Sequence, residues 1–172
     1  RISMKDQEHD KAFIRSAGEH YVLARIAKEL AIPAGLAPEN TKDIDILAIH
    51  PSHESPIRIQ VKTRTDGKSA DEGWMMKQKH ENICDKDLFY VFVSLPTKWT
   101  DDCQPKTYIM PAKEVAEVLK KTHQDWLNTP GQKGQAHKDT TVRRIKPTYK
   151  ESPDIPSNWL DQYKDKWELL IK

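Results

Sequence analysis

The sequence predicts a single α/β (α+β) domain in which helices pack on a mixed β-sheet. Three observations support this class: a long amphipathic helix comes first, a strand hairpin follows, and a continuous apolar run marks a central strand. The chain has 172 residues, which is enough for one domain with a sizeable core. Hydrophobic residues make up 37% and charged residues 31%, a composition typical of folded chains.

The first half of the chain predicts one helix and three strands. Residues 4–30 predict a helix, because apolar side chains recur at helical spacing before Pro33 and Gly35 end the pattern; they include Phe13, Ile14, Ala17, Tyr21, Val22, Ala24, Ile26 and Leu30. Residues 36–42 predict a polar loop. Residues 44–49 and 57–63 predict a hairpin joined by HPSHESP, and 88–95 (LFYVFVSL) a buried central strand.

The second half predicts mainly helix and loop. Residues 74–83 are expected to form a short helix after a polar loop over 64–73. A short edge strand is expected at 108–110, and Pro111 then opens a helix that reaches Leu127. Residues 128–156 are rich in proline and glycine and predict a basic loop region, and 157–171 a closing helix or packing segment, with Trp159 and Trp167 anchored in the core.

Composition excludes several classes of protein. No apolar run approaches the roughly 20 residues of a membrane span, so we expect no membrane partner. The only two cysteines, Cys84 and Cys103, exclude a disulfide scaffold and disfavour a cysteine zinc site. We therefore expect reduced thiols that serve as packing residues, and a cytoplasmic protein.

The net charge of +2 conceals a basic segment. Residues 120–150 contain eight Lys or Arg and two Asp, a local charge of +6. A basic region on a nearly neutral protein favours an anionic partner, nucleic acid first, although a solvated loop would have the same composition.

Charged and amide side chains converge on the predicted hairpin. Alternate residues of a strand share a face, so Gln60 and Lys62 lie together, and Asp43, Asp45 and Leu47 share the matching face of the first strand. If the strands pair, Asp45 lies beside Gln60 and Lys62. The ordinary reading of this group is a cross-strand ion pair between Asp45 and Lys62.

Glu19 is a fourth member of this group. It precedes Val22, Leu23 and Ile26 by three, four and seven residues, which puts it on the helix stripe that faces the sheet. A carboxylate there is costly unless it is paired or binds a cation. Two carboxylates and an amide oxygen are hard ligands that suit Mg²⁺ or Mn²⁺.

These residues resemble the PD-(D/E)xK nuclease superfamily, which includes restriction endonucleases and Holliday-junction resolvases. The resemblance rests on GEHYVLARIAKEL, DIDILAI and IRIQVKTR within residues 18–64, and on WMMKQKHENI, LFYVFVSL and HQDWLNTPGQKGQAHKD, which are similar to uncharacterised bacterial members. It implies a restriction-endonuclease-like mixed sheet flanked by helices, and a metal-dependent endonuclease acting on DNA more than RNA. Restriction or defence is the expected biology, with repair or recombination next.

The resemblance also implies roles for individual residues. Asp45 would be the primary metal ligand, Gln60 and the Val61 carbonyl further ligands, and Glu19 a ligand of the metal or its water. Lys62 would position the attacking water. The sequence departs from the family at Gln60, which replaces the usual acidic residue, and it lacks the signature proline, because Lys42 and Asp43 precede Ile44 and Asp45. Asp43 is a substitute ligand on the same face.

Several basic residues are candidates to bind nucleic acid: Arg64, Lys77, Lys79, Lys138, Arg143 and Arg144. His123 and Trp126 lie three apart on the predicted second helix, where packing is their ordinary role. Cutting both strands of a duplex often takes two sites, which favours a homodimer, although no interface can be read from the sequence. The alternative is a catalytically weak or inactive module of the same fold that binds nucleic acid or a partner protein.

Overall fold

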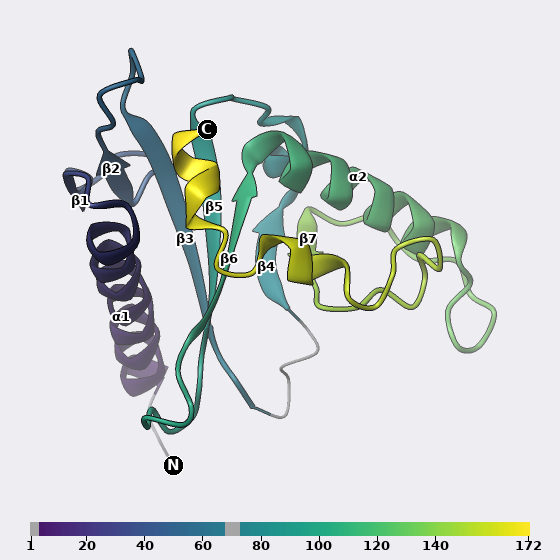
Figure 1. Ribbon diagram of the computed structural model, residues 1–172. Coiled ribbons are helices and arrows are strands. Elements are labelled where there is room, and N and C mark those ends of the chain that lie inside the picture. The colour runs from purple at the N-terminus through teal and green to yellow at the C-terminus, as the bar shows by residue number, and fades with distance from the viewer. Residues whose placement is uncertain (1–3, 68–72) are drawn as a thin grey trace.

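A five-stranded mixed sheet forms the centre of the protein (Figure 1). The computed structural model describes residues 4–67 and 73–172, with side chains from residue 10 onward. The strands are β1 (Ala34–Leu36), β2 (Ile46–Ala48), β3 (Ile57–Thr65), β5 (Leu88–Leu95) and β6 (Lys106–Pro111), in the order β1-β2-β3-β5-β6. Only β3 and β5 are parallel, and the other pairs are antiparallel. The predicted α/β class is therefore confirmed.

Different layers cover the two faces of this sheet. Helix α1 (Met4–Leu30) packs on one face, beside the last 3₁₀ helix, η4 (Trp167–Ile171). The other face carries α2 (Ala112–Asn128), the two-stranded sheet of β4 (Trp74–Lys77) and β7 (Val142–Ile145), and two further 3₁₀ helices, η2 (Gln78–Asn82) and η3 (Trp159–Tyr163). In the described residues, no helix is both long and apolar enough to span a membrane.

Strand alternation gives each face its own core. Ile57, Ile59 and Val61 of β3 point toward Val22 and Ile26 of α1 and form the first core. The second core lies on the opposite face and contains Trp74, Met76, Tyr90, Phe92, Met110, Leu119 and Trp159. Strand β5 is buried along its whole length because it contributes to both cores, which explains its unbroken apolar sequence.

Gly18 sets how closely α1 approaches β3. A Cβ atom added at Gly18 would lie 1.9 Å from Oγ1 of Thr63, so only glycine permits this contact. The close approach brings the neighbouring Glu19 toward the sheet, as the sequence predicts.

The long elements were predicted well. The structure confirms the first helix, the hairpin, the central strand, the edge strand and the helix that follows Pro111. Trp159 and Trp167 are buried, as predicted. Two smaller expectations are wrong: Phe13 is 61% exposed, and Cys84 and Cys103 are exposed rather than packed.

The short elements of the second sheet were not predicted. The helix expected over 74–83 is instead β4 followed by η2, because alternate residues of Trp74–Lys77 are buried. The loop expected over 128–156 contains β7, whose pairing partner β4 lies far earlier in the chain. The residues that follow the first helix form strand β1, which was not predicted. Strand β3 extends to Thr65, two residues beyond its predicted end. Part of the loop expected over 64–73, residues 68–72, lies outside the described residues.

Candidate active site

The Asp45 carboxylate lies against β3 just where pairing with β2 stops. The Asp45 N–H donates to the Ile59 carbonyl at 2.9 Å, and Asp45 Oδ2 accepts the Val61 N–H at 2.7 Å. The side chain thus replaces the backbone acceptor that a longer β2 would provide. This hydrogen bond holds one carboxylate oxygen in place.

Asp43 does not share the face expected for it. Strand β2 begins only at Ile46, and Asp43 has a left-handed φ of 60°, a conformation that aspartate tolerates better than most residues. Both its carboxylate oxygens accept from Lys79 Nζ, at 2.5 and 2.6 Å. Asp43 and Lys79, predicted as a substitute metal ligand and a phosphate contact, are therefore paired with each other.

Glu19 and Asp45 are electrostatic neighbours although they come from different elements. Burial raises the pKa of the half-buried Glu19, and the negative charge of Asp45 raises it further. Burial also raises the pKa of Asp45, although the Val61 N–H and the Lys62 ammonium oppose this. A carboxyl group whose pKa is raised by a neighbouring carboxylate marks a place that a cation would stabilise.

Lys62 lies close to this carboxylate pair but makes no ion pair with it in the described residues. Burial lowers the pKa of Lys62, and the charges of Asp45 and Asp43 partly offset this effect. The expected direct ion pair between Asp45 and Lys62 is absent from the described contacts. Its ammonium therefore remains available to another partner.

Three buried polar atoms near Lys62 have no hydrogen-bond partner in the described residues: Gln60 Oε1, His80 Nε2 and Tyr90 Oη. Gln60 and Tyr90 are direct neighbours in the β3–β5 register, and the His80 and Tyr90 rings are 5.9 Å apart. Burial and the Lys62 charge lower the pKa of His80, and burial raises that of Tyr90. Buried polar atoms without partners are rare in folded proteins and often mark a functional site.

Sequence reasoning found Gln60 but missed His80 and Tyr90. Tyr90 lies within an apolar run, where a tyrosine predicts only packing. His80 lies in a segment predicted to be a helix, and its approach to Tyr90 depends on the pairing of β4 with β7. No local signal marks either residue.

The remaining predicted cations differ in availability. The Arg64 guanidinium lies 4.3 Å from the Trp74 ring centroid and donates to Ser94 Oγ at 3.2 Å. Arg143 is buried and binds Glu81 and the carbonyls of Thr140 and Val142. Lys77 and Lys138 are exposed, and Arg144 lines a separate pocket between α2 and β7.

The donor set for a metal is small but chemically suitable. In the part of the chain that the structure describes, no group of three or more His, Cys, Asp or Glu side chains could hold an ion. A metal here would therefore depend on the two carboxylates together with amide and backbone oxygens, which are ordinary ligands of Mg²⁺. The orphaned Oε1 atom of Gln60 fits that role.

Comparison with known proteins identifies no relative. No family model, curated protein or solved structure matches this chain.

Proposed function

We propose that this protein is a metal-dependent nuclease that hydrolyses phosphodiester bonds, with DNA as its substrate. One observation carries the proposal: the charge of Asp45 acts both on the Glu19 carboxylate, whose pKa it raises, and on the half-buried ammonium of Lys62. In such an arrangement the carboxylates can bind a metal cation, and the ammonium beside them can offset negative charge on the phosphate.

The chain offers four oxygen ligands for Mg²⁺ or Mn²⁺. Glu19 and Asp45 would supply carboxylates, Gln60 its amide oxygen and Val61 its backbone carbonyl. When bound, the metal would polarise the phosphate and lower the pKa of a water molecule. Asp45 is oriented for this role by the Val61 N–H, which leaves its second oxygen for another partner.

Lys62 would contact the substrate and the attacking water rather than stabilise the folded protein. Its ammonium has no ion-pair partner in the described residues, and burial lowers its pKa, so it can position an attacking water and offset charge on the phosphate. Lys77 and the Lys79–Asp43 pair supply further positive and negative charge near it.

The binding module remains the second candidate. Gln60 removes one negative charge from the metal site, and Lys79 already neutralises Asp43. Such a site would bind DNA in a salt-sensitive manner and would need no divalent metal.

Cleavage assays test the two candidates directly. Supercoiled plasmid, linear duplex, single-stranded DNA and RNA are each incubated with Mg²⁺, Mn²⁺ or EDTA. We expect metal-dependent cutting of DNA, and a loss of at least about 100-fold in rate for Lys62→Met, which retains the apolar stem of the lysine but removes the charge. Lys113→Met, which changes an exposed lysine on α2, serves as the matched control.

The variants and metals separate the outcomes. Cutting by Lys62→Met at the parental rate would show that the site is assigned wrongly. Folded protein that cuts no substrate but binds DNA in EDTA would favour the binding module. Preferred cutting of RNA would retain the site and change the substrate.

A further inference from the structure

Three buried side chains of the candidate active site each have a polar atom without a hydrogen-bond partner in the described residues. Gln60 of β3, His80 of η2 and Tyr90 of β5 are only 7%, 2% and 0% exposed. The atoms without a partner are Gln60 Oε1, His80 Nε2 and Tyr90 Oη. Buried polar atoms of folded proteins nearly always bind another protein group or an ordered water, so these three require an explanation.

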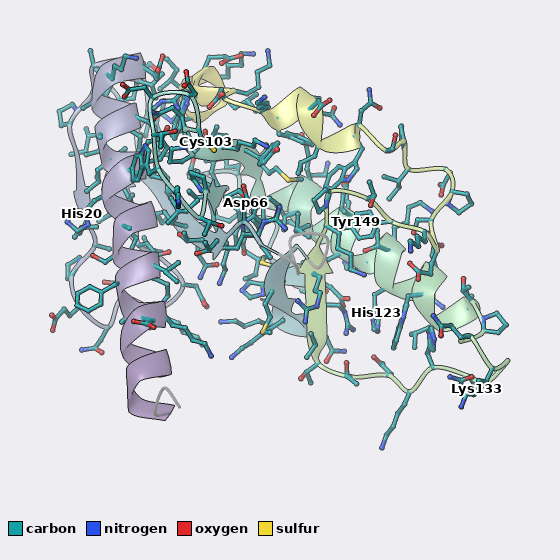
Figure 2. All side chains as sticks on the ribbon, turned by 90° about the horizontal axis from the view of Figure 1, so that it is seen from below. His20, Asp66, Cys103, His123, Lys133 and Tyr149 are labelled. Carbon is teal, nitrogen blue, oxygen red and sulfur yellow. The ribbon has the colours of Figure 1, made fainter. Side chains whose placement is uncertain are left out.

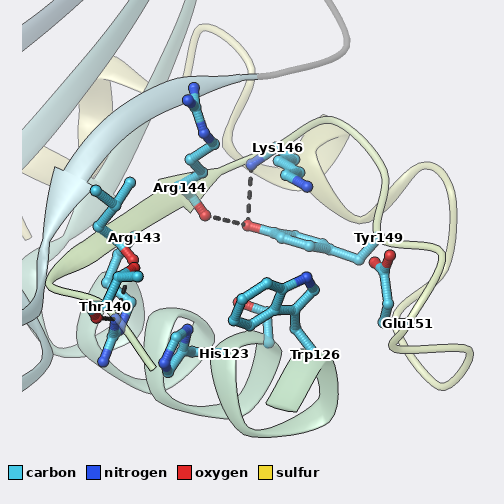
Figure 3. Close-up of a pocket in the computed structure, with 10 residues that line it drawn as sticks. His123, Trp126, Thr140, Arg143, Arg144, Lys146, Tyr149 and Glu151 are labelled. Carbon is cyan, nitrogen blue, oxygen red and sulfur yellow. Dashed lines mark hydrogen bonds between the residues drawn. The ribbon is translucent and has the colours of Figure 1, made fainter. Parts of the chain in front are cut away.

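A second tyrosine in this protein shows how such a hydroxyl is usually satisfied. The Tyr149 hydroxyl, in the pocket between α2 and β7, donates to the Arg144 carbonyl at 3.0 Å and accepts the Lys146 N–H at 2.9 Å (Figure 3). Figure 2 shows Tyr149 on the side of the molecule that carries α2, apart from α1. The more deeply buried hydroxyl of Tyr90 has no such bonds in the described residues.

The three side chains belong to one cluster beside Lys62. Gln60 and Tyr90 are direct neighbours in the register of β3 and β5, on the face of the sheet that carries β4 and η2. The edge of the His80 ring meets the Tyr90 ring, with centroids 5.9 Å apart and planes at 84°. The Lys62 charge also acts on His80, whose pKa it lowers.

The three atoms differ in what they can donate or accept. His80 Nδ1 lies 2.9 Å from the Lys77 nitrogen and 3.0 Å from the Lys77 carbonyl oxygen. The backbone nitrogen always carries its hydrogen, so Nδ1 accepts it, and the neutral ring then carries its own hydrogen on Nε2. Burial lowers the pKa of His80 and thus favours this neutral form. His80 Nε2 can therefore only donate, Gln60 Oε1 can only accept, and the Tyr90 hydroxyl can do both.

A molecule that satisfies all three atoms must both donate and accept hydrogen bonds. A simple anion cannot donate to Gln60 Oε1, and a metal cation cannot accept the hydrogen of His80 Nε2. Water does both, and a buried water typically makes about three hydrogen bonds to polar groups that would otherwise lack a partner. The three unpartnered atoms match that capacity.

We propose that one buried water molecule accepts a hydrogen bond from His80 Nε2, donates one to Gln60 Oε1 and forms a third with Tyr90 Oη. His80 and Tyr90 are then positioning residues, which act on the candidate site through the Gln60 amide. The water holds the amide with its oxygen, rather than its NH₂ group, toward the cluster, and an amide oxygen has a second lone pair for a metal. Only this effect on a metal rests on the proposed nuclease function.

Two measurements in EDTA test the water site itself. X-ray diffraction from crystals of the parent should show a water oxygen within about 3.2 Å of all three atoms. Tyr90→Phe retains the ring and removes the hydroxyl. We expect its melting temperature to fall by about 2–4 °C, because the water loses one of its partners. If no water were bound, the same change would remove an unsatisfied buried hydroxyl and the melting temperature would rise.

Tyr149→Phe is the reference for the melting measurement. It removes a hydroxyl whose two hydrogen-bond partners are known, so its melting temperature should fall as well. Opposite signs for Tyr90→Phe and Tyr149→Phe would contradict a bound water, because they would show that the Tyr90 hydroxyl is unsatisfied.

Calorimetric titration with Mn²⁺ tests the effect on Gln60. Loss of a residue that orients a metal ligand typically weakens metal binding by about 10- to 100-fold, and we expect this for Tyr90→Phe. In the Gln60→Leu background, Tyr90→Phe should have no further effect, since the amide through which it acts is gone. Tyr108→Phe, on the neighbouring strand β6, is the matched control and should leave the affinity unchanged.

The outcomes separate this proposal from the nuclease proposal. A diffraction map without a water at this place, or a higher melting temperature for Tyr90→Phe, overturns the water site. Equal losses of Mn²⁺ affinity with and without the Gln60 amide overturn the positioning role. A parent protein that binds no Mn²⁺ contradicts the nuclease proposal, while the diffraction map and the melting temperatures still decide whether the water site exists.

Discussion

The identity of residue 60 determines how much negative charge the candidate site can offer to a metal. Gln60 is buried, its Oε1 atom lacks a hydrogen-bond partner in the described residues, and it stands where the nuclease superfamily that the sequence resembles has an acidic residue. An amide oxygen can bind a metal but contributes no charge. The affinity of an oxygen-rich site depends strongly on the number of charged ligands.

Gln60→Glu should therefore bind Mn²⁺ more tightly, on the order of tenfold, because the site gains a carboxylate. The same change should lower the melting temperature in EDTA, since it buries a third negative charge. Calorimetric titration with Mn²⁺ and thermal melting in EDTA measure both effects. Gln124→Glu, at an exposed position of α2, is the control. An unchanged Mn²⁺ affinity would remove Gln60 from the metal site.

Asp45→Asn should raise the melting temperature of the metal-free protein at pH 7 by a few degrees. Burial raises the pKa of Asp45 above its usual value of 3.8, so the folded protein favours the protonated form and ionisation destabilises it. Asparagine can still accept the Val61 N–H. The gain should shrink as the pH falls toward 4, because Asp45 of the parent then becomes neutral. Melting curves in EDTA between pH 4 and 7 check this, and a gain that is constant with pH would contradict it.

Local patterns predicted some residues of the site and not others. Alternation along β3 placed Gln60 and Lys62 together, and helical spacing placed Glu19 toward the sheet. The prediction for Asp43 was wrong because this residue has a left-handed φ and lies before the start of β2, so strand alternation does not apply to it. His80 and Tyr90 were not predicted as part of the site, because their proximity depends on tertiary contacts.

At the scale of elements, the contact between α1 and β3 determines how the site is assembled. At an exposed helix position, a change from glycine to alanine reduces the backbone entropy lost on folding and stabilises the helix by about 1 kcal/mol. At Gly18 the new Cβ would collide with the Thr63 side chain. We expect a loss of about 1–3 kcal/mol instead.

Urea unfolding of Gly18→Ala measures this loss. The double variant Gly18→Ala/Thr63→Ala removes the closest atoms of Thr63 and should recover part of the stability. A stabilising effect of Gly18→Ala alone would show that α1 does not pack this closely on β3.

The pairing of η2 with β7 depends on a buried ion pair. The side chain of Arg143 is 3% exposed and that of its partner Glu81 is 13% exposed. Arg143→Met should lower the free energy of unfolding by about 3–5 kcal/mol, because it leaves the Glu81 carboxylate buried without its cation.

Urea unfolding also measures the cost of Arg143→Met. The double variant Arg143→Met/Glu81→Leu should recover most of it, since neither charge is then left unpaired. A small loss in the single variant would instead indicate that Arg143 is available for a phosphate contact, as the sequence suggested.

Sequence patterns did not predict the short strands of the second sheet. Strand β5 was predicted with its observed bounds because its eight residues, all apolar or aromatic except Ser94, are buried on both faces. Strands β4 and β7 have four residues each, and each is stabilised mainly by its distant partner. A four-residue pattern cannot distinguish a strand from a turn of helix, so the second sheet could be seen only in three dimensions.

At the scale of the whole molecule, exposed cations such as Lys77 and Lys138 should make the proposed DNA binding sensitive to salt. The logarithm of the binding constant should fall linearly with the logarithm of salt concentration, with a slope of about 0.7–0.9 per phosphate contact. Lys138→Gln/Arg144→Gln should reduce that slope by about 1.4–1.8 if both residues bind phosphates. Anisotropy titrations between 50 and 200 mM salt in EDTA measure it, and an unchanged slope would exclude these two contacts.

The first and last elements share one core, and this affects how the protein can be synthesised. Trp167 and Leu170 of η4 pack in the same cluster as Val22 and Ile26 of α1, and Arg25 lies 5.2 Å from the Trp167 ring. During translation, α1 leaves the ribosome before η4 and lacks these partners until residues 167–170 have followed. At about 5–20 residues per second, that interval lasts roughly 7 to 27 seconds. Throughout it, the apolar face of α1 must be covered by β3 and β5 alone or by a chaperone.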